Sequence, residues 1–203
     1  MTRARLGILL SGRGSNFLAL AGAIERREVD AEIALVASNV PEAPGLVKAR
    51  EMGLATEEIS HRGLKRDQHE ARISEALRAR AVDWVCLAGY MRLLTPSFVD
   101  EFRDRILNIH PSLLPAFPGL DAQRQAWDYG AKVSGCTVHL VDAGMDTGPI
   151  VAQEAVSLVG LRSAEEAAAA ILRAEHSLYP AALRRIISEP WHLEGRRVVF
   201  EPT

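Results

Sequence analysis

The sequence has few cysteines and no cysteine motif. Its two cysteines, Cys86 and Cys136, belong to no CxxC pair and stand at no zinc-ligand spacing with histidine. Each lies in an apolar run, which predicts a small buried side chain. We therefore predict no metal site.

A basic excess and long apolar runs are also missing. The formal net charge is -2, whereas general nucleic-acid binders carry a basic surplus. No stretch approaches the roughly 20 apolar residues of a membrane helix. The apolar run at residues 6–10 is too short for a signal peptide. We expect a cytoplasmic protein that binds neither nucleic acid nor membrane.

Strand and helix patterns alternate along the chain, without repeats or linkers. With 203 residues and 48% hydrophobic content, the chain predicts one α/β domain over residues 1–203. The alternation predicts a mostly parallel twisted sheet with helices on both faces, in a Rossmann-like arrangement that binds ligands at the carboxyl ends of its strands. Strands are expected at 6–10, 32–37, 54–59, 83–87, 105–109, 133–141 and 149–156, helices after 15 and 95 and at 44–52, 66–80 and 163–187, and a hairpin at 193–200.

A glycine loop, residues 12–16, joins the first strand to the first helix. Glycines let backbone N–H groups approach an anion, and a helix N-terminus favours negative charge. We predict a phosphate site here, with the hydroxyls of Ser11 and Ser15 nearby and a helix cap at Ser15 and Asn16. A dinucleotide site is disfavoured because Phe17 replaces the third glycine of GxGxxG. A simple tight turn stays open as the alternative.

A histidine and an asparagine end the fifth strand. Asn108 and His110 are two residues apart, so their side chains point to the same side of the strand. A later polar loop contains Asp146, which could reach and orient the His110 ring. No serine or cysteine nucleophile stands beside a base in a known pattern. The group suits acyl transfer by direct attack of an amine, with amide and imidazole donors stabilising a tetrahedral intermediate.

Several motifs carry a family resemblance that covers nearly the whole chain. The motifs are Ser11-Gly12-x-Gly14-Ser15-Asn16, Ala88-Gly89-Tyr90-Met91-Arg92, Leu107-Asn108-Ile109-His110-Pro111-Ser112-Leu113-Leu114-Pro115, Pro118-Gly119-Leu120, Asp146-x-Gly148-Pro149 and Glu175-His176-x-x-Tyr179-Pro180. Through these motifs the chain resembles the phosphoribosylglycinamide formyltransferases, folate-dependent enzymes of purine biosynthesis.

The resemblance implies a reaction. It implies that the amine of glycinamide ribonucleotide attacks the formyl carbon of 10-formyltetrahydrofolate, the cosubstrate, without a metal or a covalent enzyme intermediate. Asn108, His110 and Asp146 match the catalytic trio. His110 is expected to protonate the folate leaving nitrogen, and Asp146 to favour the charged form of the His110 ring.

The resemblance also implies small-molecule substrates and two sets of binding residues. The protein is expected to be a monomer or a homodimer. Arg13 either adds positive charge near the phosphate or points to water, and Arg66 either contacts folate or is a solvated helix charge. The ribonucleotide set is Gly12, Arg13, Gly14, Ser15, Asn16 and Glu175. The folate set is Arg66, Met91, Arg92, Leu93, Leu94, Asn108, Val141, Asp142 and Asp146.

Other expectations concern the segment after His110 and the remaining histidines. Residues 112–130 are proline-broken and are predicted to form a lid. The resemblance implies a cis Leu114–Pro115 peptide. His139 is expected to be a buried structural residue, with a place in the site as the alternative. His61, His69 and His192 are expected at the surface.

Three other functions compete with the transferase. A formyltetrahydrofolate hydrolase usually carries an additional N-terminal regulatory domain, for which the early first strand leaves no room. An initiator-tRNA formyltransferase carries a basic C-terminal domain, which the near-neutral charge disfavours. A non-catalytic folate or nucleotide sensor would be expected to lack a catalytic group, and all three groups are present.

Overall fold

The computed structural model describes residues 3–201. The chain divides into two compact units, the first ending at Leu107 and the second beginning at Asn108. The boundary falls inside strand β5 (Ile106–His110). One domain over residues 1–203 therefore stays a prediction.

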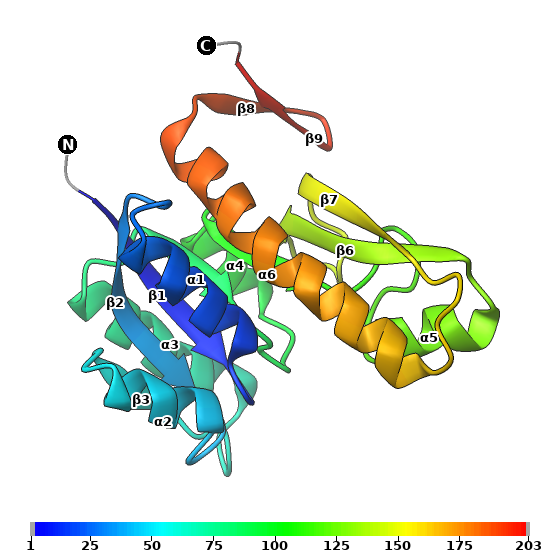
Figure 1. The fold of residues 1–203 in the computed structure, drawn as a ribbon. Helices are drawn as coiled ribbons and strands as arrows, with labels where there is room; N and C mark the ends of the chain where they lie inside the picture. Colours follow the sequence, from blue (N-terminus) through cyan, green and yellow to red (C-terminus); the bar gives the residue numbers. More distant parts are fainter. Residues whose placement is uncertain (1–2, 202–203) are drawn as a thin grey trace. The chain divides into compact units, whose positions relative to one another are not determined.

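The first unit is a parallel sheet with helices on both faces. Its strand order is β3-β2-β1-β4, and each neighbouring pair is parallel. Helices α1 and α2 lie on one face and α3 on the other (Figure 1). The elements are β1 (Ala4–Leu10), α1 (Ser15–Glu25), β2 (Ala31–Ser38), α2 (Pro44–Glu51), β3 (Thr56–Glu58), α3 (Arg66–Ala79), β4 (Trp84–Leu87) and α4 (Pro96–Glu101).

Strand β1 is buried because helices cover it. Leu6, Ile8 and Leu10 are fully buried, as the continuous apolar run predicts. Gly7 allows α3 to pack closely, since a Cβ atom there would lie 2.3 Å from Leu77 Cδ2. The carboxyl end of β1 thereby has a fixed place, from which the glycine loop starts.

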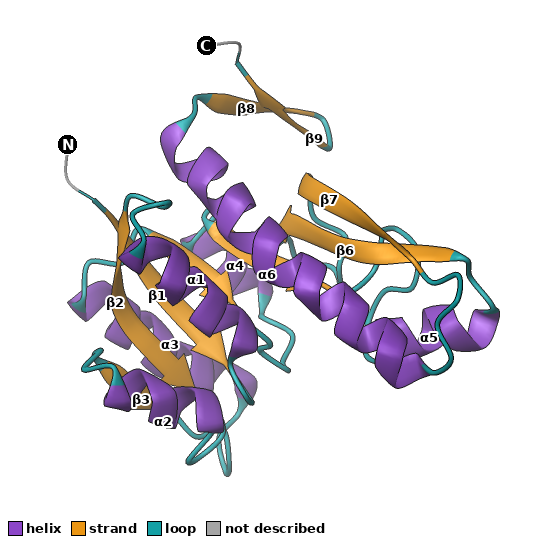
Figure 2. Ribbon diagram, in the orientation of Figure 1, coloured by secondary structure: helices purple, strands orange, loops and turns teal. Residues whose placement is uncertain are grey.

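The second unit combines antiparallel strands with one long helix. Strands β6 and β7 pair antiparallel, as do β8 and β9, and β7 pairs parallel with β9. Helix α6 packs on β6, β7 and α5, and Figure 2 shows it as the longest helix of the unit. The elements are α5 (Ala122–Tyr129), β6 (Val133–Leu140), β7 (Ile150–Ser157), α6 (Ala164–Ser188), β8 (Trp191–Glu194) and β9 (Arg197–Phe200).

Most predicted elements are confirmed, and three local predictions were wrong. Helix α5 was not predicted. The residue that caps α1 is Gly14, so Ser15 is the first helical residue instead of its cap. His69 is buried, with its Nε2 atom 2.7 Å from the Ile59 carbonyl oxygen, because it lies on the inner face of α3.

Candidate active site

The second unit brings His110 and Asp146 together. His110 lies at the end of β5, and Asp146 lies in the loop between β6 and β7. His110 Nδ1 is 3.3 Å from Asp146 Oδ2, and the two side chains are only 5% and 13% exposed. The sequence had only indicated that Asp146 could reach this ring, and the structure gives that contact.

Both ring nitrogens of His110 face hydrogen-bond acceptors. Nε2 is 2.9 Å from the Phe117 carbonyl oxygen, which can only accept. The Asp146 carboxylate faces the other nitrogen and also accepts a hydrogen bond from the Gly119 amide at 2.7 Å. An N–H group on either nitrogen therefore finds an acceptor. The two contacts orient the ring, with Nε2 pointing away from the carboxylate.

His139 orients the Asn108 amide. His139 Nδ1 is 2.8 Å from the Leu140 carbonyl oxygen, so this nitrogen carries the ring hydrogen. The bare Nε2 atom accepts from Asn108 Nδ2 at 3.1 Å. Burial lowers the pKa of His139, which keeps the ring neutral and its Nε2 free to accept. His139 is thus buried and hydrogen-bonded, as expected, and it also contacts a candidate catalytic residue.

The Asn108 amide keeps one hydrogen for another partner. An amide nitrogen carries two hydrogens, and His139 takes one of them. Asn108 as a whole is half-buried. An oxyanion next to Asn108 would find a donor whose orientation is already set.

A network of polar contacts holds the segment that follows His110. The buried Thr137 hydroxyl donates to the Ser112 carbonyl oxygen at 2.7 Å and accepts from the Leu114 amide at 3.1 Å. Gln153 Nε2 donates to the Leu114 carbonyl oxygen at 2.9 Å. The Leu114–Pro115 peptide is cis, as the resemblance implies. The contacts of Gln153 were missed, because only the pairing of β6 with β7 brings it to this segment.

Asp142 builds the turn that carries Asp146. Asp142 Oδ1 accepts from the Gly144 amide at 3.0 Å and from the Thr147 hydroxyl at 2.7 Å. A Cβ atom on Gly148 would lie 1.7 Å from the Leu140 carbonyl oxygen, so only glycine fits there. Val141 is half-buried at the start of this turn. Asp146 itself has a φ of 55° and depends on this fixed frame.

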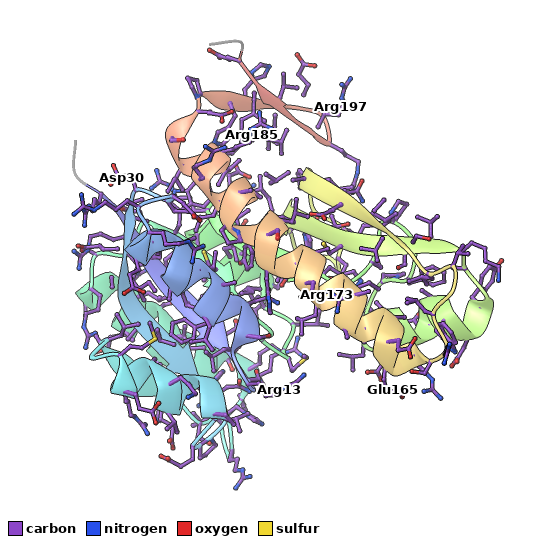
Figure 3. The ribbon with its side chains drawn as sticks, viewed as in Figure 1. Arg13, Asp30, Glu165, Arg173, Arg185 and Arg197 are labelled. Atoms are coloured by element: carbon purple, nitrogen blue, oxygen red, sulfur yellow. The ribbon has the colours of Figure 1, made fainter. Side chains whose placement is uncertain are left out.

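The first unit holds the glycine loop. Gly14 has a φ of 71° and begins α1 without a side-chain cap. A Cβ atom on Gly12 would meet nothing within 4 Å, so there is open space beside the loop. Arg13 is exposed, and Figure 3 labels it beside the start of α1. Ser15 is half-buried and Asn16 is buried in the first turn.

Gly45, in α2, packs against the glycine loop. The Gly45 amide donates to the Gly12 carbonyl oxygen at 3.0 Å. A Cβ atom on Gly45 would lie 2.9 Å from Gly14 Cα. Sequence reasoning missed this contact, since no local signal connects the two glycines.

The expected folate-binding residues of the first unit lie in two places. Met91 and Leu93 are 66% and 51% exposed, which is unusual for large apolar side chains and typical of a ligand edge. Arg92 is half-buried and Leu94 is buried. Arg66 is the first residue of α3 and is exposed, which fits either of its two expected roles.

Glu175 lies buried on α6, in the second unit. Burial raises the pKa of the nearby Cys136 thiol to about 12, and the charge of Glu175 adds to this shift. Cys136 therefore stays a neutral thiol, and the thiolate is the nucleophilic form of cysteine. Both cysteines are buried, as predicted.

Comparison with known proteins shows the family. Residues 4–183 match the family model described as formyl transferase, so the chain belongs to that family. A phosphoribosylglycinamide formyltransferase of Bacillus subtilis is 38% identical over 90% of this chain and 94% of its own length. A crystal structure of glycinamide ribonucleotide transformylase 1 from Symbiobacterium toebii superposes with a TM-score of 0.95 at 44% identity, covering 98% of this chain and 94% of the other. The predicted α/β fold class is confirmed.

Some relatives are much longer. The trifunctional purine biosynthetic protein adenosine-3 of Drosophila melanogaster is 43% identical over 92% of this chain, which spans only 14% of that protein.

Within residues 3–201, no group of three or more histidine, cysteine, aspartate or glutamate side chains is arranged to hold a metal ion. No helix in the same range is long and apolar enough to cross a membrane.

Proposed function

We propose that this chain transfers the formyl group of 10-formyltetrahydrofolate to the amine of glycinamide ribonucleotide. The observation that carries the proposal is the contact of His110 with Asp146 beside the fixed amide of Asn108. The group has a proton carrier, a charge partner and an amide donor. The names of the relatives that match over nearly their whole length agree with this reaction.

The reaction begins with attack of the substrate amine on the formyl carbon. The new C–N bond gives a tetrahedral intermediate whose oxygen carries negative charge. The free hydrogen of the Asn108 amide donates to this oxygen, and its orientation needs no change because His139 holds the other hydrogen.

Collapse of the intermediate breaks the bond to the folate nitrogen. The Nε2–H group of His110 breaks its hydrogen bond to the Phe117 carbonyl oxygen and gives its proton to that nitrogen. The neutral ring then takes up the proton that the attacking amine loses, so the protons balance and the ring returns to its starting state. Asp146 stabilises the charged ring before this step.

The binding roles are proposals of the same kind. The loop at residues 12–16 binds the ribonucleotide phosphate through backbone N–H groups, because α1 begins there without a side-chain cap. Glu175 contacts the ribonucleotide. Met91 to Leu94, Val141 and Asp142 bind the folate, with Arg66 as a further contact. We also propose a cytoplasmic protein, monomeric or dimeric, with small-molecule substrates only.

The test is product formation from a 10-formylfolate with and without glycinamide ribonucleotide. Tetrahydrofolate product that requires the ribonucleotide, and that is lost in His110→Ala, is the expected result. Product without the ribonucleotide would instead establish a hydrolase. Binding of both ligands without turnover would establish a sensor.

A further inference from the structure

The side chain of Ser11 joins three loops of the first unit. Ser11 follows β1, and its hydroxyl accepts a hydrogen bond from the Met91 amide at 2.9 Å. The same hydroxyl donates to Asn39 Oδ1, which follows β2, at 2.6 Å. The Ser11 amide also donates to the Gly89 carbonyl oxygen at 3.1 Å. One residue thus connects the loops after β1, β2 and β4.

Asn39 is itself held in place. It is only 4% exposed. His61 Nδ1 lies 3.2 Å from Asn39 Nδ2 and 3.0 Å from the Asn39 carbonyl oxygen, so the segment after β3 braces it. The acceptor for the Ser11 hydroxyl therefore has a fixed position. A fixed acceptor sets the direction of the hydroxyl hydrogen and leaves an oxygen lone pair for the Met91 amide.

These contacts change the expected role of Ser11. The sequence suggests a hydroxyl near the phosphate. A serine hydroxyl has one hydrogen, and here it is committed to Asn39. Ser11 is thus poorly suited to donate to a phosphate. Its hydroxyl instead connects the glycine loop, which begins at the next residue, to the loop that begins at Gly89.

We infer that Ser11 is a positioning residue that sets the glycine loop and the 91–94 loop in one fixed arrangement for the two substrates. The inference rests on the proposed function, since it assigns those loops to the ribonucleotide phosphate and to folate. Without the hydroxyl, the Met91 amide loses its acceptor and the Asn39 carboxamide loses its donor. Both loops then sample more conformations, and both substrates bind less well.

The kinetic test compares Ser11→Ala with Ser11→Thr, which keeps a hydroxyl. In Ser11→Ala, the KM values of both substrates are expected to rise about three- to tenfold, as for the loss of one ordinary hydrogen bond. The kcat value and its pH profile are expected to stay within about twofold, since no catalytic group changes. Ser11→Thr should restore both KM values. Ser188→Ala removes another hydroxyl, bonded to the Arg184 carbonyl oxygen, and should change neither KM value.

Two outcomes would overturn the inference. Unchanged KM values in a folded Ser11→Ala variant would mean that the hydroxyl only stabilises the fold. A rise confined to the ribonucleotide KM would make Ser11 a phosphate ligand. If Ser11→Ala does not fold, Asn39→Ala removes the acceptor of the hydroxyl and should give the same double rise, and unchanged KM values there would equally refute the inference.

Amide hydrogen exchange separates this inference from the proposed function. The Met91 amide should exchange about three- to tenfold faster in Ser11→Ala than in the wild type, whatever reaction the protein catalyses. Unchanged exchange at Met91 would refute the bridge itself. Faster exchange in a protein without formyl transfer would leave the bridge in place and refute only the proposed function.

Discussion

Replacing Gly45 by alanine should weaken ribonucleotide binding, although Gly45 is not itself a proposed ligand. The new Cβ atom would lie 2.9 Å from Gly14 Cα and 3.0 Å from the Gly12 carbonyl oxygen. Carbon atoms pack best at about 3.5–4.0 Å, so the backbones have to separate by roughly half an ångström or more. A third neighbour, Leu10 Cδ2 at 3.0 Å, is the end of a side chain, but the other two are backbone atoms of the glycine loop, so the loop itself has to move.

The magnitude follows from two opposing effects. Overpacking costs about 1–3 kcal/mol, whereas alanine is favoured over glycine in a helix by up to about 1 kcal/mol. The free energy of unfolding should therefore fall by about 3 kcal/mol at most. Binding should suffer more specifically, because phosphate contacts through backbone N–H groups depend on their exact spacing. We expect the ribonucleotide KM to rise about tenfold and the folate KM to change by less than about twofold.

The assay is steady-state kinetics with each substrate varied, together with a urea unfolding curve. Gly53→Ala is the matched control at the other end of α2. Gly53 has a φ of 73°, and a Cβ atom there meets nothing within 4 Å, so the substitution costs stability without moving the loop. A folded Gly45→Ala variant with the wild-type ribonucleotide KM would refute the support assigned to this contact.

Three further predictions address the other charged and polar groups. Asp146→Asn keeps the size of the side chain but removes the charge 3.3 Å from His110 Nδ1, so kcat should fall by about tenfold or more. Wild-type turnover in a folded variant would contradict this role. His139→Asn removes the ring nitrogen that accepts from the Asn108 amide, so kcat should fall about tenfold with little change in either KM value. An unchanged kcat would mean that the amide needs no partner to orient it. Burial lowers the pKa of His69, so the unfolded state binds more protons than the folded state just below the ordinary histidine pKa of about 6.5. The free energy of unfolding, measured with urea, should therefore fall as the pH drops through this range. His69→Gln should make this fall less steep, whereas the exposed His192→Gln should not. An equal dependence on pH in both variants would contradict the role of His69.

Local sequence signals predicted most of the fold, because each one acts over a few residues. The predicted strands and helices end within two residues of the observed ones. The positions of Asn108 and His110 followed from the alternation of side chains along one strand. Candidate catalytic residues at strand ends can therefore be found from sequence alone.

Two local signals were present but were outweighed by their surroundings. Helix α5 follows Asp121 and ends at Gly130, whose φ of 82° is typical of a helix C-terminus, but the prolines before it suggested an irregular segment. His69 has polar neighbours, yet it is four and eight residues from the buried Ile73 and Leu77. That spacing places it on the inner face of the helix.

Long-range polar contacts could not be predicted. Ser11 and Met91 are 80 residues apart, and no pattern in either segment indicates the other. The same holds for Gly45 against Gly14, and for Gln153, which reaches Leu114 from another strand. These contacts depend on the register of strands and the packing of helices, which arise only when the chain folds.

In the proposed function, the candidate catalytic group alone does not select an acceptor. The donors proposed at Asn108 and His110 would stabilise the same tetrahedral intermediate whether water or an amine attacks the formyl carbon. Selection of the amine has to come from residues that bind the rest of the acceptor and hold its nitrogen near the carbon. In the proposed function these residues include the glycine loop, so Gly45 and Ser11, which support that loop, influence which nucleophile reacts. The group around His110 instead sets the rate of the chemical step.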